Sequence, residues 1–158
     1  MESALIIASF PYVILLFNIF RGLAKIRIFT PRHEPSTFVS VVAACRNEEE
    51  NITRLLDHLS EQDYPSSRYE VIIVDDNSCD GTFKIASEYN GKAGITVIRN
   101  YKTGKKRALN SGISRAKGDL IVTTDADCRM GEKWLRSIAA FYEDNKPDLI
   151  ICPVRAEK

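Results

Sequence analysis

Apolar residues occur along most of the chain in short runs, and between the runs they recur at helical spacing. The runs are rich in β-branched residues and too short for helices, which indicates buried strands. The predicted strands cover residues 38–44, 69–74, 95–99, 119–124 and 148–154. The predicted helices cover residues 51–62, 81–89, 105–117 and 132–144. This alternation predicts an α/β fold of Rossmann-like type, a mostly parallel sheet with helices on both faces.

The start of the first of these helices has a candidate cap. Asn47 is followed three residues later by Glu50, the spacing of a capping box, although asparagine replaces the usual serine or threonine. Ile52, Leu55 and Leu59 then follow at the spacing of one helix face. We therefore expect a helix over 51–62, with Asn47 and Glu50 resembling a capping box at its start.

The first twenty residues have a different pattern. No side chain is charged between residues 3 and 20, a run of about 18 residues that would span about 27 Å as a helix. We predict a transmembrane helix over 3–20, a juxtamembrane linker over 21–37 and a globular domain over 38–158. Arg21 and Lys25 follow the apolar run, which favours a single-pass anchor with the domain facing the cytoplasm. A cleaved signal peptide is the alternative, but its N-terminus is normally basic, whereas this one carries Glu2.

Composition removes several classes of function. The formal net charge is +1, so bulk charge does not favour nucleic acid as a partner. The four cysteines form no Cys-x-x-Cys pair, and with two histidines the usual zinc spacings are absent. Cysteines that end apolar runs, such as Cys45, indicate reduced, buried thiols. A lesser hypothesis is that Cys45, Cys79 and Cys128, which all follow predicted strands, line one cleft.

Polar residues with candidate chemistry follow the predicted strands. Ligands of parallel sheets bind beyond the carboxyl ends of the strands, so these residues should meet at one edge. Asp125 and Asp127 form an Asp-x-Asp pair suited to Mg²⁺ or Mn²⁺, which prefer oxygen ligands. Residues 75–78 are acidic and polar, and a basic run begins at Lys105. Taken singly, each group also suits a turn, a helix cap or a solvated face. Neither a Walker A motif nor a dinucleotide fingerprint is present.

Taken together, these segments resemble one known family. Four blocks, at residues 39–52, 71–82, 104–112 and 118–127, are similar in content and order to family 2 glycosyltransferases. The resemblance covers residues 38–154. It implies a GT-A type nucleotide-diphospho-sugar transferase fold and an inverting transfer of sugar from a nucleotide diphosphate. The anchor predicted above suggests a lipid or glycan acceptor at a membrane.

The resemblance also implies roles for individual residues. The residues expected to bind the nucleotide sugar are Ala44, Asn47, Glu48, Asp76, Lys105 and Asp125. Within this set, Asp76 would bind the base and Lys105 would lie near the phosphates. Asp127, together with Asp125, would hold Mg²⁺ or Mn²⁺.

One part of the family's machinery has no counterpart in the sequence. The general base, an aspartate in a later acidic motif, is expected beyond Lys158, and so is the Gln-x-x-Arg-Trp motif of processive members. An alternative is therefore a membrane-tethered module that binds nucleotide sugar without catalysis. A nucleotidyltransferase is a third possibility, but a Gly-rich signature would be expected where residues 45–48 read Cys-Arg-Asn-Glu.

Overall fold

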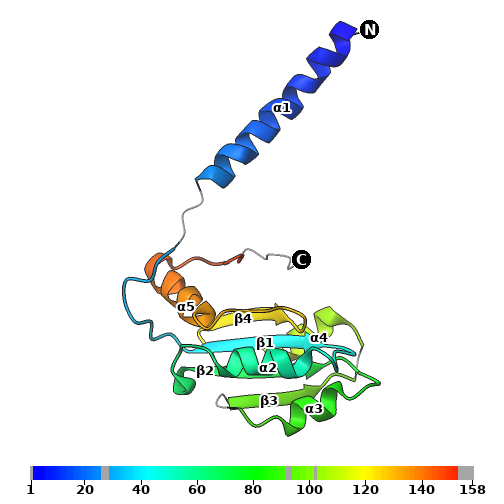
Figure 1. Ribbon diagram of the computed structural model, residues 1–158, viewed down its shortest axis with the longest axis vertical. Helices are drawn as coiled ribbons and strands as arrows, with labels where there is room; N and C mark the ends of the chain where they lie inside the picture. Colours follow the sequence, from blue (N-terminus) through cyan, green and yellow to red (C-terminus); the bar gives the residue numbers. More distant parts are fainter. Residues whose placement is uncertain (1, 26–28, 92–93, 102, 153–158) are drawn as a thin grey trace. The chain divides into compact units, whose positions relative to one another are not determined.

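The computed structural model describes residues 2–25, 29–91, 94–101 and 103–152, with only the backbone described for residues 2–9. The chain divides into two compact units, Met1–Thr30 and Pro31–Lys158. The first contains the helix α1 (Glu2–Ala24), and the second contains the sheet and its covering helices (Figure 1).

The second unit is built on a parallel sheet of four strands. The strands are β1 (Val39–Cys45), β2 (Tyr69–Asp75), β3 (Gly94–Arg99) and β4 (Leu120–Asp125). Their order in the sheet is β3-β2-β1-β4, and every neighbouring pair is parallel. The helices are α2 (Ile52–Ser60), the 3-10 turn η1 (Ser66–Arg68), α3 (Thr82–Glu88), α4 (Lys105–Ile113) and α5 (Trp134–Asn145). The predicted strands over 38–44, 69–74, 95–99 and 119–124 are confirmed to within one residue at each end.

Helices cover both faces of the sheet, as predicted. Side chains of a strand alternate between the faces, and β1 is buried on both. Val41 and Ala43 pack in the larger core with residues of α2, α3 and α5. Val42 packs in a smaller core on the opposite face, against Ala108 of α4. Continuous β-branched runs therefore form strands here because neither face of the central strands meets water.

Gly112 allows α4 to pack directly on β1 and β2. A Cβ atom at this position would lie 2.4 Å from Val42 Cγ1 and 2.9 Å from Val74 Cγ2, and valine side chains have few rotamers with which to yield. We expect Gly112→Ala to lower the free energy of unfolding by about 1–3 kcal/mol, measured by urea denaturation. Asn110→Ala, at an exposed position of α4, should change it by less than about 0.5 kcal/mol. Equal effects of the two substitutions would contradict this account of the packing.

Two local predictions are wrong. Residues 148–152 form no strand, and residues 153–154 of the predicted fifth strand lie outside the described residues. Leu149 and Ile151 in this run are exposed, so the apolar pattern is not matched by a partner strand. The predicted capping box is also absent: α2 begins at Ile52 after Asn51, with no side-chain cap, and Asn47 bonds elsewhere.

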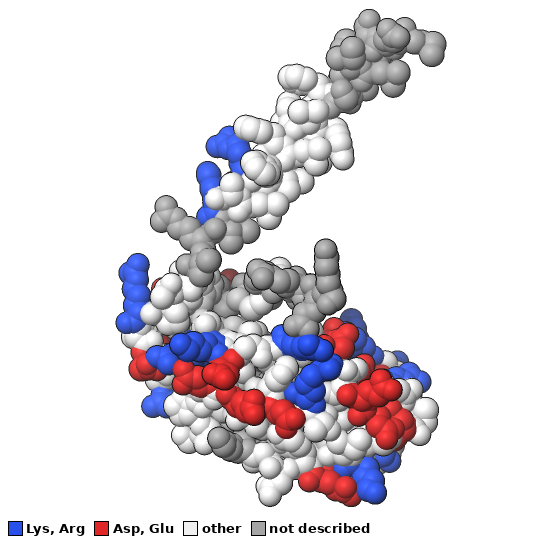
Figure 2. Space-filling view, viewed as in Figure 1, with Lys and Arg blue, Asp and Glu red and all other residues white. Residues whose placement is uncertain are grey.

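The predicted single-pass anchor with a cytoplasmic domain is corrected by the structure. Residues 3–20 do form a helix, but no helix within the described residues has the length and apolar character needed to cross a bilayer. A helix that crosses a bilayer needs about 20 mainly apolar residues. Figure 2 shows the described part of the helix as largely uncharged, with basic side chains at one end. In the sequence, Arg21 and Lys25 follow the apolar run.

The segment before β1 belongs to the second compact unit, although we predicted a linker as far as residue 37. Its backbone is held by side chains from elsewhere in that unit. The Tyr64 hydroxyl donates to the Thr37 carbonyl at 2.6 Å, and the Arg68 guanidinium donates to the Ser36 carbonyl at 2.6 Å. Glu143 of α5 accepts hydrogen bonds from the same segment. Ser36 and Thr37 are therefore hydrogen-bonded to the globular unit, although most of residues 31–37 are not buried.

Candidate functional site

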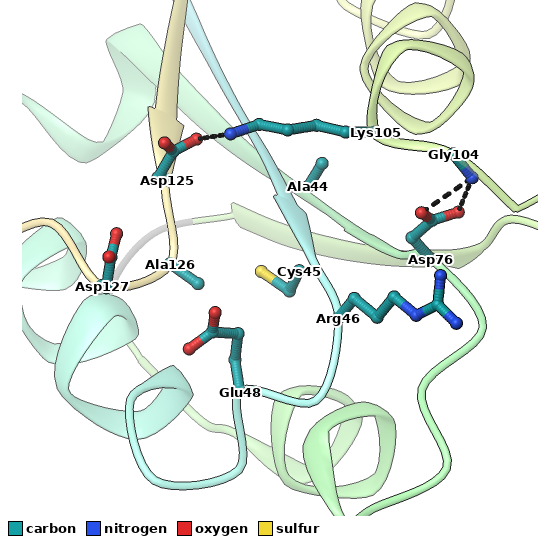
Figure 3. Close-up of a pocket in the computed structure, with 10 residues that line it drawn as sticks. All are labelled: Ala44, Cys45, Arg46, Glu48, Asp76, Gly104, Lys105, Asp125, Ala126 and Asp127. Carbon is teal, nitrogen blue, oxygen red and sulfur yellow. Dashed lines mark hydrogen bonds and ion pairs between the residues drawn. The ribbon is translucent and has the colours of Figure 1, made fainter.

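A pocket of about 370 Å³ lies at the carboxyl edge of the sheet. Strand register brings its walls together, because Ala44 of β1 pairs with Asp125 of β4, and Cys45 pairs with Asp75 of β2. The pocket is lined by Ala44, Cys45, Arg46, Glu48, Asp76, Gly104, Lys105, Asp125, Ala126 and Asp127 (Figure 3). Residues that are as much as 83 positions apart in sequence (44 to 127) thus share one site.

Asp76 is a buried carboxylate held by the chain around it. Asp76 follows β2 directly and is only 4% exposed. The Gly104 N–H donates to both carboxylate oxygens at 2.9 Å, and Asn100 Nδ2 donates to one of them at 2.8 Å. Its own backbone N–H donates to the Cys45 carbonyl at 2.8 Å. These contacts fix Asp76 against the pocket wall and supply the hydrogen bonds that a buried polar group needs.

Lys105 and Asp125 form an ion pair on the other side of the pocket. Lys105 Nζ lies 2.7 Å from Asp125 Oδ1, and both side chains remain more than half exposed. In Figure 3 the lysine side chain extends from α4 past Ala44 to the end of β4. The hydrogen bond to Asp125 raises the pKa of Lys105 above its ordinary value, so the ammonium group is charged at neutral pH.

Asp125 and Asp127 fit a divalent cation in part. Both line the pocket, both are exposed, and Asp125 already holds a cationic group. Within the described residues, no group of three or more His, Cys, Asp or Glu side chains is arranged to hold a metal ion. Two carboxylates are the number that Mg²⁺ commonly takes from a protein when phosphate oxygens and water supply the rest. The site therefore suits a metal bound together with a phosphate ligand.

Asn47 and Glu48 connect this pocket to a neighbouring hollow. Glu48 lines both, whereas Asn47 lines the neighbour only. Asn47 has a left-handed φ of 54°, and its side-chain oxygen accepts the Cys79 N–H at 3.0 Å. The Glu48 N–H donates to Thr82 Oγ1 at 2.8 Å. The structure thus ties the loop after β1 to the loop before α3, and it places Asn47 beside the pocket and not in its wall.

The cysteines do not form one cleft. Cys45 lines the pocket, but Cys79 and Cys128 are not among its lining residues, and all four cysteines are free. Burial raises the pKa of the Cys45 thiol to about 12, with further contributions from the charges of Glu48, Asp75 and Asp125. A thiol with that pKa is protonated at neutral pH, which disfavours a nucleophilic role for Cys45.

Three residues at the site, Gly104, Asn100 and Arg46, were given no role in the sequence analysis. Gly104, at φ 136°, places its N–H on Asp76, a backbone conformation that favours glycine. Asn100 is buried and follows β3, so the strand-end argument would have indicated it. Arg46 lines the pocket directly after β1 and could have been found in the same way.

Comparison with known proteins identifies the class. A doubly covered parallel sheet with an acidic pocket at its carboxyl edge is typical of nucleotide-binding α/β proteins. The sequence profile described as "Glycosyl transferase family 2" matches residues 40–158. The chain therefore belongs to glycosyltransferase family 2.

Relatives of the chain are longer proteins. The poly(ribitol-phosphate) beta-N-acetylglucosaminyltransferase TarS of Staphylococcus aureus is 30% identical over 118 residues, which are 73% of this chain and 21% of TarS. The beta-monoglucosyldiacylglycerol synthase of Nostoc sp. is 33% identical over 113 residues, 69% of this chain and 24% of the synthase. The chain thus spans about a fifth to a quarter of these relatives.

A solved structure supports the fold. The mannosyltransferase PcManGT from Pyrobaculum calidifontis, in complex with GDP-Man and Mn²⁺, is 31% identical with a TM-score of 0.74. The match covers 90% of this chain and 43% of that protein. The four-stranded parallel sheet with its helices is accordingly GT-A-like, as the resemblance in sequence implied.

Proposed function

We propose that this chain forms the donor-binding part of an inverting glycosyltransferase, which transfers a sugar from a nucleotide diphosphate to a lipid or glycan acceptor. The observation that carries the proposal is the convergence of Asp76, Lys105, Asp125 and Asp127 on one pocket in a family 2 chain. Further support comes from PcManGT, which was solved with GDP-Man and Mn²⁺. The names of TarS and of the Nostoc synthase indicate glycan and lipid acceptors for those relatives.

Each side chain of the pocket suits one part of a nucleotide sugar. Asp76, buried and rigidly held, offers acceptor oxygens to the N–H groups of a base. Lys105, at the first position of α4, offers a positive charge to the diphosphate. Ala44 has a small side chain at the pocket wall, and Glu48 closes the side next to Cys45. These assignments leave Asp125 and Asp127 for the cation.

Asp125 and Asp127 would hold Mg²⁺ or Mn²⁺ beside the diphosphate. When bound, such a cation offsets the charge of the phosphates and stabilises the departing nucleoside diphosphate as a Lewis acid. Acceptor deprotonation needs a further group, because these four side chains all act on the donor. A second candidate function is binding of nucleotide sugar without transfer. It is favoured because the pocket carboxylates are all assigned to the donor, which leaves none of them to deprotonate an acceptor.

Thermal unfolding of the whole chain tests the proposal. The chain would be heated with UDP, GDP, CDP or dTDP, each with and without Mn²⁺. At a concentration near 100 times the dissociation constant, the matching nucleotide should stabilise the fold by about 2.7 kcal/mol, and only with Mn²⁺. Absence of stabilisation by all four would contradict donor binding. Transfer of labelled sugar to membranes or glycans would then separate the transferase from the binding module.

Asp76→Asn tests the role assigned to the base subsite. Loss of a hydrogen bond to a charged acceptor costs about 1.5–3 kcal/mol, so nucleoside diphosphate affinity should fall roughly 10- to 150-fold. Mn²⁺-pyrophosphate, which has no base, serves as the matched ligand and should bind the variant and the native chain alike. Calorimetric titration measures both. An equal loss for pyrophosphate would show that Asp76 shapes the whole pocket instead of contacting the base.

A further inference from the structure

The N-terminal end of α4 contacts two carboxylates on opposite sides of the pocket. Gly104 donates its N–H to Asp76, and the ammonium group of Lys105 lies 2.7 Å from Asp125. Figure 3 shows both contacts, with the Lys105 side chain extended across the space between α4 and β4. In the function proposed above, these two carboxylates contact the base and the metal ion. Both carboxylates therefore already have a partner from the N-terminal end of α4.

The Lys105–Asp125 contact is the more easily exchanged of the two. The side chains of Lys105 and Asp125 are 62% and 52% exposed, and ion pairs in water are held weakly. Asp76, by contrast, is buried and bonded to backbone. Lys105 can thus leave Asp125 without disturbing the fold, while Asp76 stays in place. A cation that binds Asp125 must first displace the ammonium group or share the carboxylate with a like charge.

We propose that Lys105 is an internal counter-ion of this pocket: it neutralises Asp125 when the pocket is empty and transfers to the diphosphate when a donor binds. This inference rests on the proposed donor function. Lys105 would then couple two binding events. A diphosphate that attracts Lys105 frees Asp125 for a divalent cation beside Asp127, and a cation that occupies Asp125 frees Lys105 for the diphosphate. By linkage, each ligand raises the affinity for the other by the same factor.

Mn²⁺ titration of the whole chain tests this coupling, with free Mn²⁺ followed by electron paramagnetic resonance. Without nucleotide, Lys105→Met should bind Mn²⁺ roughly tenfold more tightly than the native chain, within the range usual for coupled sites. Lys106→Met is the matched control, since Lys106 is the exposed next residue of α4 and is not among those lining the pocket. The control should bind Mn²⁺ like the native chain. Equal Mn²⁺ affinity of the Lys105→Met variant and the native chain would overturn the proposal.

The same Mn²⁺ titration in the presence of UDP or GDP tests whether Lys105 couples diphosphate binding to Mn²⁺ binding. Either nucleotide, if it binds, should raise Mn²⁺ affinity in both chains, because its phosphates supply metal ligands, but by roughly tenfold more in the native chain than in Lys105→Met. If neither nucleotide binds the native chain, the donor function fails, whereas the comparison in Mn²⁺ alone still decides whether Lys105 neutralises Asp125. If a nucleotide binds but its effect on Mn²⁺ affinity is the same in both chains, the donor function stands and the coupling role of Lys105 is overturned.

Lysine modification of the native chain gives an independent measurement that needs no variant. Acetylation of individual lysines would be followed by peptide mass spectrometry. Saturating Mn²⁺ alone should speed modification of Lys105, because it displaces the amine from Asp125, and Mn²⁺ with the nucleotide should slow it again. Lys106 should react at one rate throughout. A Lys105 rate that is unaffected by Mn²⁺ would contradict the exchange.

Discussion

Asp127→Asn is expected to abolish the metal-dependent stabilisation of the chain by nucleotide. Asp127 lines the pocket, is exposed, and is the carboxylate of the Asp-x-Asp pair that Lys105 does not bind. Even outer-shell changes at metal sites cost 10- to 100-fold, so loss of a direct ligand should lower Mn²⁺ affinity by at least about 100-fold. If nucleotide affinity falls by the same factor because nucleotide binding depends on the metal, nucleotide stabilisation drops from about 2.7 to about 0.4 kcal/mol at the same concentrations.

Asp119→Asn is the matched control for this change. Asp119 is exposed just before β4, at the opposite end of the strand from the pocket, and its replacement removes the same charge. Thermal unfolding with Mn²⁺ and nucleotide should be native-like in the control. If Asp127→Asn and Asp119→Asn lose stabilisation equally, the effect belongs to net charge and not to a ligand. If neither loses it, Asp127 does not hold the cation.

The fold was largely predictable because the central strands of the sheet are buried on both faces. Strands such as β1 are then continuous apolar runs, and parallel pairing follows from the helices between them. The errors came from segments whose environment the local pattern does not reveal. The run over 148–154 has a strand-like composition but lacks a partner in its described part. Residues 3–20 lack charge, yet the structure shows no helix within its described residues that could cross a bilayer.

The site was predictable only as far as strand ends determine it. The strand-end rule correctly predicted that Asp76, Asp125 and Asp127 lie at one edge of the sheet, although their binding roles remain predictions. It could not predict contacts made by loops. Asn47 looked like a local helix cap, but its oxygen accepts from Cys79, 32 residues away. The Gly104 contact with Asp76 likewise depends on the course of a loop, which hydrophobic periodicity does not encode.

The second large effect is expected in acid, at the segment before β1. The Glu143 carboxylate accepts the Ser36 N–H at 2.7 Å, the Thr37 N–H and hydroxyl at 2.8 Å each, and lies 2.7 Å from His33 Nε2. Burial raises the pKa of Glu143, but hydrogen bonds from Ser36, His33 and Thr37 outweigh it and lower the pKa from 4.5 to about 2. The charged carboxylate thus binds this segment more strongly than the protonated form does.

The direction of the pH effect follows from that lowered pKa. Between about pH 4.5 and pH 2 the unfolded chain binds a proton at Glu143 and the folded chain does not, so stability falls as pH falls through this window. The loss in the free energy of unfolding should approach about 3 kcal/mol, and the stabilisation by Glu143 is fully present above pH 4.5.

Glu143→Gln should lower the free energy of unfolding by about 2 kcal/mol at pH 7, because it breaks charge-assisted hydrogen bonds, and should show a flatter pH profile in acid. Urea denaturation from pH 7 to pH 2.5 measures both. Glu132→Gln, at an exposed glutamate just before α5, should retain the native profile, and an identical acid slope in Glu143→Gln would show that other carboxylates cause it.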